Sequence, residues 1–137
     1  LRIAAILHDI GKISVPDSVL LKPGRLDDDE YTVIKKHSQA GEDILRTVLL
    51  FDRVRTIIRH HHERWDGGGY PYGLAGTTIP FLSRILAVAD AFDAMTNNRP
   101  YRKALPLCTA HEELRKNSGL QFDQQIVKAM LSLFPTA

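Results

Sequence analysis

Apolar residues in this chain recur every three or four positions, and this spacing constrains its fold more than any other feature. Such a spacing matches one face of an α-helix. The longest stripe of this kind consists of Phe81, Leu82, Ile85, Leu86, Ala89, Phe92 and Met95. The sequence contains no pair of alternating apolar and polar runs joined by a hairpin turn, which a β-sheet would need. It therefore predicts an all-α fold.

Capping residues, prolines and glycines indicate where the helices begin and end. A glycine-rich loop is expected over residues 66–78, because five of the nine glycines lie between Gly67 and Gly76. The expected helical elements are a first helix ending near Gly11, a short turn over residues 15–22, a helix from an N-cap at Asp27 toward Gly41, a segment over residues 42–48, a helix over residues 53–62 capped by Asp52, a long helix starting at Pro80, and two final helices capped by Thr109 and Asp123.

The size and charge of the chain limit its possible functions. Its 137 residues can bury one core, so we expect one domain. A net charge of +2 is too small for bulk binding to a nucleic acid polymer or an acidic membrane, and no apolar run reaches the roughly 20 residues that cross a bilayer. A single cysteine, Cys108, suits a reducing compartment, so we expect a cytoplasmic domain without membrane contact. Because Leu1 is not preceded by Met and already stands in an apolar helical stretch, we expect a longer parent protein.

Histidine and aspartate residues gather at a few places along the chain. These places are His8-Asp9, His37, His60-His61-His62 and Asp90. Imidazole and carboxylate ligands without thiolates suit Fe, Mn, Ni, Co or Zn in an open hydrolytic site. An Asp that directly follows a His can present one oxygen to each of two metals, and two metals about 3.5 to 4 Å apart promote phosphoryl transfer. The pattern therefore indicates a dinuclear metal site.

Simpler roles are open to several of these residues. His37 could complement the dipole at the end of a helix, and His111, isolated near a helix start, is expected to be an ordinary surface or core imidazole. Consecutive residues step by about 100° around a helix, so at most two neighbours in the run 60–62 can face one site. Asp90 is harder to explain without a cation, because an ionised carboxylate beside an apolar core needs a partner.

Three motifs together resemble the HD-GYP family, a branch of the HD superfamily of metal-dependent phosphohydrolases. The motifs are His8-Asp9-Ile10-Gly11-Lys12, the stretch His61-His62-Glu63-Arg64-Trp65-Asp66-Gly67-Gly68-Gly69-Tyr70-Pro71, and the segment from Val88 to Thr96 continued by Arg99-Pro100-Tyr101-Arg102. The resemblance runs essentially from end to end. It implies one HD-GYP domain over residues 1–137, an HD-domain helical bundle truncated at its N-terminal end. Family members carry another histidine on a preceding helix, and some carry a glutamate; both would precede Leu1.

The resemblance also implies a role for individual residues. The implied metal ligands are His8, Asp9, His37, His61, His62 and Asp90, with Asp9 as the bridge. Asp9 and Lys12 are the implied catalytic residues, and Lys12 is expected to face the scissile phosphate. The implied substrate-binding residues are Lys12, Tyr70, Arg99 and Arg102. The carboxylates expected to orient the ligating histidines are those of Glu63, Asp66 and Asp93.

Members of the family hydrolyse the bacterial second messenger cyclic di-GMP to pGpG or GMP. We therefore expect a metal-dependent cyclic di-GMP phosphodiesterase with two or three divalent ions, Fe or Mn in the first place and Ni, Co or Zn as alternatives. Expected partners are an upstream receiver or other sensory domain and GGDEF domains, which would contact residues 67–71. Two alternatives stay open: a module that binds cyclic di-GMP or docks a GGDEF domain without hydrolysis, and an HD hydrolase of another nucleotide. The intact ligand motifs favour hydrolysis, whereas the missing upstream histidine leaves the activity of this piece open.

Overall fold

The computed structural model describes residues 1–98 and 103–135, which fold into helices and loops without a β-strand among them. The α-helices are α1 (Arg2–Leu7), α2 (Asp17–Leu20), α3 (Asp28–Lys35), α4 (His37–Leu45), α5 (Asp52–Arg59), α6 (Phe81–Thr96), α7 (Leu107–Lys116) and α8 (Gln124–Leu133). Three 3₁₀ turns join them: η1 (Ile10–Ser14), η2 (Leu49–Phe51) and η3 (Gly76–Thr78). The all-α prediction is confirmed. Over the described ranges, no helix combines the length and apolar character that a bilayer crossing requires.

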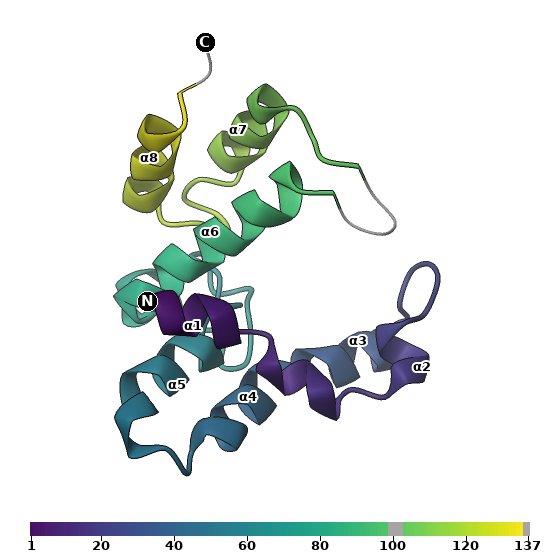
Figure 1. The fold of residues 1–137 in the computed structure, drawn as a ribbon. Coiled ribbons are helices and arrows are strands. Elements are labelled where there is room, and N and C mark those ends of the chain that lie inside the picture. Colours follow the sequence, from purple (N-terminus) through teal and green to yellow (C-terminus); the bar gives the residue numbers. More distant parts are fainter. Residues whose placement is uncertain (99–102, 136–137) are drawn as a thin grey trace.

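Helix α6 runs diagonally through the molecule and connects two groups of helices (Figure 1). Helices α7 and α8 lie on one side of it, and α1, α4 and α5 lie on the other, with α2 and α3 farther out (Figure 1). Each side has its own apolar cluster. One consists of Val88, Phe92, Ala110, Leu114, Phe122 and Val127, and the other of Ala4, Leu45, Ile57, Ile58 and Leu86. Because α6 contributes to both clusters, its apolar stripe is the shared core of the fold.

Two of the predicted helix caps are confirmed. Asp27 caps α3 in a capping box, in which its Oδ1 accepts a hydrogen bond from the Glu30 backbone nitrogen and Glu30 Oε2 accepts one from the Asp27 nitrogen, both at 2.9 Å. Asp123 caps α8 by accepting from the Gln125 nitrogen at 2.9 Å. Short acceptor side chains therefore start these helices as the sequence indicates.

Other predicted boundaries are wrong. Asp52 is the first residue of α5 and not its cap, and Thr109 lies inside α7, which begins directly after Pro106. Proline cannot donate the backbone hydrogen bonds of a helix interior, so it fixes the earlier start. The single helix expected from Asp27 toward Gly41 is two helices, α3 and α4, which meet at Lys36.

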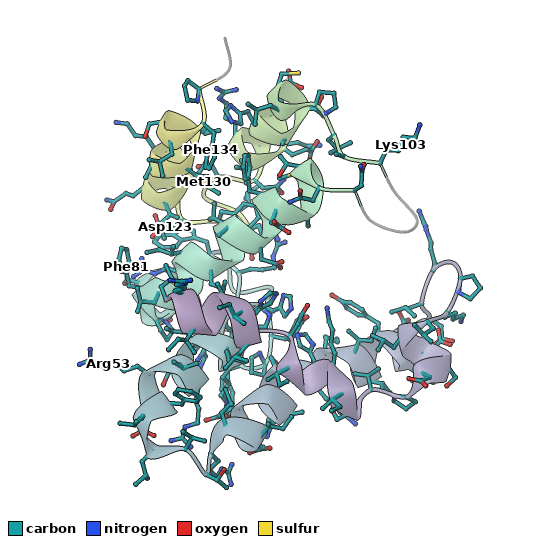
Figure 2. All side chains as sticks on the ribbon, in the orientation of Figure 1. Arg53, Phe81, Lys103, Asp123, Met130 and Phe134 are labelled. Carbon is teal, nitrogen blue, oxygen red and sulfur yellow. The ribbon has the colours of Figure 1, made fainter. Side chains whose placement is uncertain are left out.

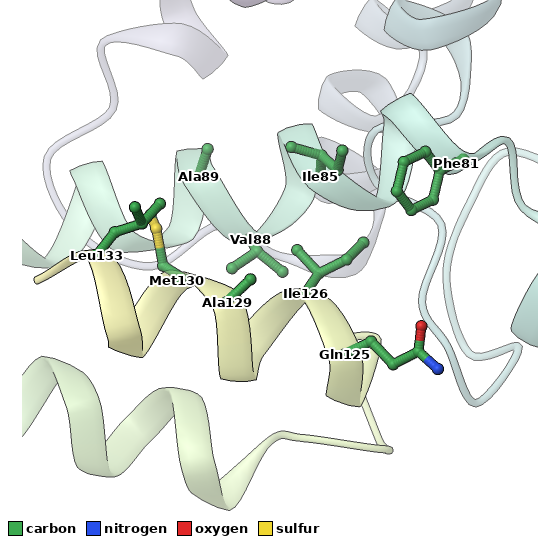
Figure 3. A pocket seen from close by; sticks show the side chains of 9 residues that line it. All are labelled: Phe81, Ile85, Val88, Ala89, Gln125, Ile126, Ala129, Met130 and Leu133. Atoms are coloured by element: carbon green, nitrogen blue, oxygen red, sulfur yellow. The ribbon is translucent and has the colours of Figure 1, made fainter.

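Side chains cover the surface of the bundle, and exposed Arg53 and Lys103 point away from it (Figure 2). A hollow of about 260 Å³ lies between α6 and α8. Its lining residues, labelled in Figure 3, are Phe81, Ile85, Val88, Ala89, Gln125, Ile126, Ala129, Met130 and Leu133. Since this described lining contains no titratable side chain, the hollow offers no group for acid–base or metal chemistry.

Candidate metal centre

The His8-Asp9 pair lies where α1 ends and η1 begins. The turn packs directly on α4, because a Cβ built on Gly11 would lie only 1.9 Å from the backbone oxygen of His37. Only glycine permits such a close approach between two backbones. Gly11 therefore brings Asp9 and His37 together, with 3.5 Å between Asp9 Oδ1 and His37 Nε2.

Asp9 lies at the middle of the cluster. Its Oδ1 faces His37, and its Oδ2 lies 3.5 Å from His8 Nε2. His8 Nε2 in turn lies 3.6 Å from Oδ1 of Asp90, which α6 carries. Lys12 donates a hydrogen bond to Asp9 Oδ2 at 2.6 Å. The two oxygens of one carboxylate thus face two different imidazoles.

His61 and His62, just after α5, complete the cluster. One ligand nitrogen of each of His37, His61 and His62 lies within 4.8 Å of the others. His60 instead lies against Tyr72, with 5.6 Å between the ring centroids. Two neighbours of the run 60–62 thus face the cluster, although α5 ends at Arg59 and the run forms a turn, not the helix that the sequence predicts.

Backbone contacts fix the tautomers of three of these histidines. The Nδ1 atom lies within hydrogen-bond distance of the carbonyl three residues earlier, at 2.8 Å for His8, 2.7 Å for His37 and 2.5 Å for His61. A carbonyl only accepts, so Nδ1 carries the proton and Nε2 keeps the lone pair in the neutral ring. The Nε2 atoms of His37 and His61 are buried without a hydrogen-bond partner in the described structure. A divalent cation would supply the missing partner, so the donor set fits a metal.

The electrostatics also favour metal binding. Burial lowers the pKa of His61 to about 4 and that of His62 to about 2, and it lowers the pKa of His37. These rings are neutral at pH 7 and their lone pairs are available. His8 differs, because the Asp90 carboxylate beside its Nε2, at 3.6 Å, raises its pKa, and the same contact lowers the pKa of Asp90.

The glycine-rich loop folds back onto the histidine pair. The Tyr70 nitrogen donates a hydrogen bond to the His62 oxygen at 3.2 Å, and the Tyr70 ring stacks on the His62 ring with 4.8 Å between centroids. A Cβ on Gly69 would lie 2.3 Å from the Arg64 nitrogen, so a glycine is required there. Burial raises the pKa of the Tyr70 hydroxyl. The loop therefore holds Tyr70 as a wall of the site.

Glu63 has a role beyond the predicted one. It is 4% exposed, and its two oxygens accept hydrogen bonds from the Tyr72 and Leu74 nitrogens at 2.8 and 2.9 Å. The sequence predicts that Glu63 orients a ligating histidine; among the described residues, the hydrogen bonds that it accepts come instead from backbone amides. Glu63 anchors the loop that carries Tyr70, a role that sequence reasoning missed because the partners are backbone amides.

The other two predicted orienting carboxylates also bond elsewhere. Asp66 pairs with Arg64 at 2.6 Å and accepts from the Gly68 nitrogen at 3.0 Å. Asp93 accepts a hydrogen bond from the Asn97 amide at 2.8 Å. Within residues 1–98 and 103–135, no hydrogen bond joins either carboxylate to a histidine, so their orienting role stays a prediction. Asp93 nevertheless borders the centre.

Two hollows open beside the cluster. One, of about 360 Å³, is lined by Ala5, His8, Leu86, Ala89, Asp90 and Asp93. The other, of about 240 Å³, is lined by Thr32, Lys35, Lys36, Gln39, Tyr70 and Pro71. The lysines of the second hollow were not among the predicted site residues, although they directly precede His37. The predicted substrate-binding residues Arg99 and Arg102 lie outside the described residues.

Comparisons with known proteins show which family and which relatives this chain resembles. A family model described as "HD domain" matches residues 1–126. The chain is 47% identical over 133 residues to the cyclic di-GMP phosphodiesterase response regulator RpfG of Xanthomonas campestris, and these residues cover 96% of the chain and 35% of that protein. It is 44% identical over 135 residues to a cyclic di-GMP phosphodiesterase of Thermotoga maritima, covering 97% of the chain and 37% of the relative. The chain thus spans about a third of the length of these relatives.

A solved structure shows the same fold. The crystal structure of a cyclic GMP-AMP-specific phosphodiesterase from Vibrio cholerae aligns with a TM-score of 0.71 at 21% sequence identity. The alignment covers 97% of this chain and 37% of that one. At this identity the likeness concerns the arrangement of helices.

Proposed function

The chain belongs to the HD domain family, and from that premise we propose that it is the catalytic domain of a metal-dependent phosphodiesterase that hydrolyses cyclic di-GMP to pGpG or GMP. The main support for the proposal is the position of Asp9. Its two carboxylate oxygens lie 3.5 Å from the Nε2 atoms of His8 and His37, respectively. The names of the relatives support cyclic di-GMP as substrate.

The donors fall into two groups that share Asp9. His37, His61 and His62 would hold one divalent ion with Asp9, and His8 and Asp90 would hold a second with the other Asp9 oxygen. Imidazole and carboxylate donors favour Fe or Mn, with Ni, Co or Zn as alternatives. When bound, such ions polarise a phosphoryl group and activate water at neutral pH.

The chain's own residues would bind and orient the substrate. Lys12 would move from Asp9 to a phosphate oxygen and neutralise the charge that develops there. Tyr70, stacked on His62, would limit where the dinucleotide lies. Two neutral imidazoles with lowered pKa values, His37 and His61, stay unprotonated at pH 7 and keep their lone pairs directed at the ligand site. Arg99 and Arg102 remain predicted phosphate contacts.

The partners and location belong to the same proposal. We expect an upstream receiver or sensory domain to regulate the catalytic domain, and GGDEF domains to contact residues 67–71. The exposed free thiol of Cys108 fits a reducing cytoplasm.

Hydrolysis by matched variants tests the proposal. We would load the protein with Mn²⁺ or Fe²⁺ under nitrogen and separate the products formed from cyclic di-GMP. Asp9→Asn should lower kcat roughly 10³-fold, since a bridging ligand supports about 4 kcal/mol of transition-state stabilisation. Asp43→Asn, at an exposed carboxylate on α4, is the control.

Each outcome separates the candidates. Wild-type turnover in Asp9→Asn would refute the role of the cluster. Binding of cyclic di-GMP without any product would favour the non-hydrolytic module, and turnover of another nucleotide alone would favour a different HD hydrolase.

A further inference from the structure

The hollow between α3, α4 and the glycine-rich loop lies outside the metal centre and has no role in metal binding. It measures about 240 Å³, and we call it the α3–α4 hollow. Its Tyr70 ring is shared with the metal centre, since it stacks on His62 at an interplanar angle of 29°. The Tyr70 ring therefore borders both the hollow and the imidazole cluster.

The lining combines an aromatic wall with hydrogen-bonding groups. Tyr70 and Pro71 form the wall, and Lys35, Lys36 and Gln39 supply ammonium and amide groups. Stacking of a nucleobase on an aromatic side chain contributes about 1–3 kcal/mol. An aromatic stacking wall beside polar hydrogen-bond donors is an arrangement by which proteins bind a nucleobase.

The two lysines are available as donors. Within the described residues neither Lys35 nor Lys36 forms an ion pair, whereas Lys12 and Lys22 are each 2.6 Å from a carboxylate oxygen. Lys35 lies over the Tyr31 ring, with 4.8 Å from Nζ to the centroid. Two lysines at one hollow, neither of them in an ion pair among the described residues, indicate a ligand rich in acceptors.

We propose that the α3–α4 hollow binds one guanine base of the dinucleotide, an inference that rests on the proposed function. Guanine presents two acceptors, O6 and N7, on one edge, and lysine ammonium groups donate to both. Adenine replaces one acceptor by an amino donor, which would oppose a lysine. Because Tyr70 borders both places, a nucleotide whose phosphate lies at the imidazole cluster would place its base in the hollow. Lys35 and Lys36 thereby select guanine over adenine.

Mononucleotide binding to the metal-loaded protein tests this selection. Neither 5′-GMP nor 5′-AMP is a diester, so their affinities can be measured by calorimetry without turnover. The wild type should bind 5′-GMP more tightly than 5′-AMP. The double variant Lys35→Ala/Lys36→Ala should lose at least about tenfold in 5′-GMP affinity, since a single charge-assisted hydrogen bond already contributes that much, and less than about threefold in 5′-AMP affinity. Lys128→Ala, at an exposed lysine of α8, should change neither affinity.

Two further measurements sharpen the test. Arginine also donates to guanine O6 and N7, so Lys35→Arg/Lys36→Arg should retain the preference for 5′-GMP. For cyclic di-GMP the alanine double variant should show a KM raised about tenfold. Equal affinities of the wild type for the two mononucleotides, no binding at millimolar concentration, or an equal loss for both in the double variant would overturn the inference. Absence of hydrolysis by the wild type would refute only the proposed function, because the mononucleotide titrations do not depend on turnover.

Discussion

Replacing Gly11 with alanine should move the two halves of the metal centre apart. The new Cβ would lie 1.9 Å from the His37 oxygen and 2.5 Å from the Gly41 nitrogen, while ordinary contact begins at 3.4 Å. Because both obstacles are backbone atoms, η1 must move from α4 by about 1.5 Å, the difference between 1.9 and 3.4 Å. The Asp9–His37 separation, 3.5 Å now, would grow by a similar amount. Overpacking of this kind costs about 1–3 kcal/mol, and a misplacement of about 1 Å costs roughly 10²-fold in rate.

Thermal unfolding and metal titration measure both effects. Gly11→Ala should lower Tm by about 3–5 °C for each kcal/mol lost, and it should weaken Mn²⁺ binding at least about tenfold. Gly68→Ala is the matched control, because its nearest neighbour is the Asp66 side chain at 3.3 Å, which needs to shift by only about 0.1 Å to reach ordinary contact. The control should stay within about 0.5 kcal/mol of the wild type. A Gly11→Ala protein with wild-type Tm and wild-type Mn²⁺ affinity would refute the reasoning.

Three further predictions concern single groups. In metal-free protein, Asp90→Asn should lower the pKa of His8 toward its ordinary 6.5, since the Asp90 carboxylate 3.6 Å away is the main cause of its elevation; an NMR titration in which the His8 pKa does not move would contradict this. Glu63→Gln should destabilise the fold by about 1–3 kcal/mol, because an amide NH₂ replaces one acceptor of the loop amides; it should also speed hydrogen exchange at Tyr72, and unchanged exchange would argue against the anchor. In metal-free protein, the pKa of His61 lies at about 4, below its unfolded value of 6.5. As the pH is lowered, His61 is protonated in the unfolded chain before it is protonated in the folded protein. The neutral, buried His61 therefore makes its full contribution to the free energy of unfolding only above pH 6.5. This contribution falls by about 1.4 kcal/mol per pH unit as the pH drops toward 4, and urea unfolding that showed no such fall would refute the assignment.

The helical core could be predicted from the sequence because its pattern is local. The apolar stripe of α6 and the caps at Asp27 and Asp123 depend on residues within a turn or two of one another. The break at Lys36 could not be predicted, because neither proline nor glycine marks it. The close contact of η1 with α4, seen at Gly11, is set by tertiary packing, which no local signal encodes.

The sequence motifs indicated which side chains come together at the site. They did not indicate the hydrogen-bond partners of those side chains. Imidazole and carboxylate side chains are chemically distinct, so the amino-acid sequence suffices to select His8, Asp9 and Asp90 as candidates. The hydrogen-bond partners of Glu63 could not be predicted, because they are backbone amides, which every residue except proline carries. Sequence alone does not tell which loop amide will face a buried carboxylate.

Anomalous diffraction from crystals soaked in Mn²⁺ tests the central claim most directly. Two peaks are expected on either side of the Asp9 carboxylate, one beside His37, His61 and His62 and the other beside His8 and Asp90. Saturating Mn²⁺ with no peak at Asp9, or with peaks only elsewhere on the protein, would contradict the shared dinuclear centre.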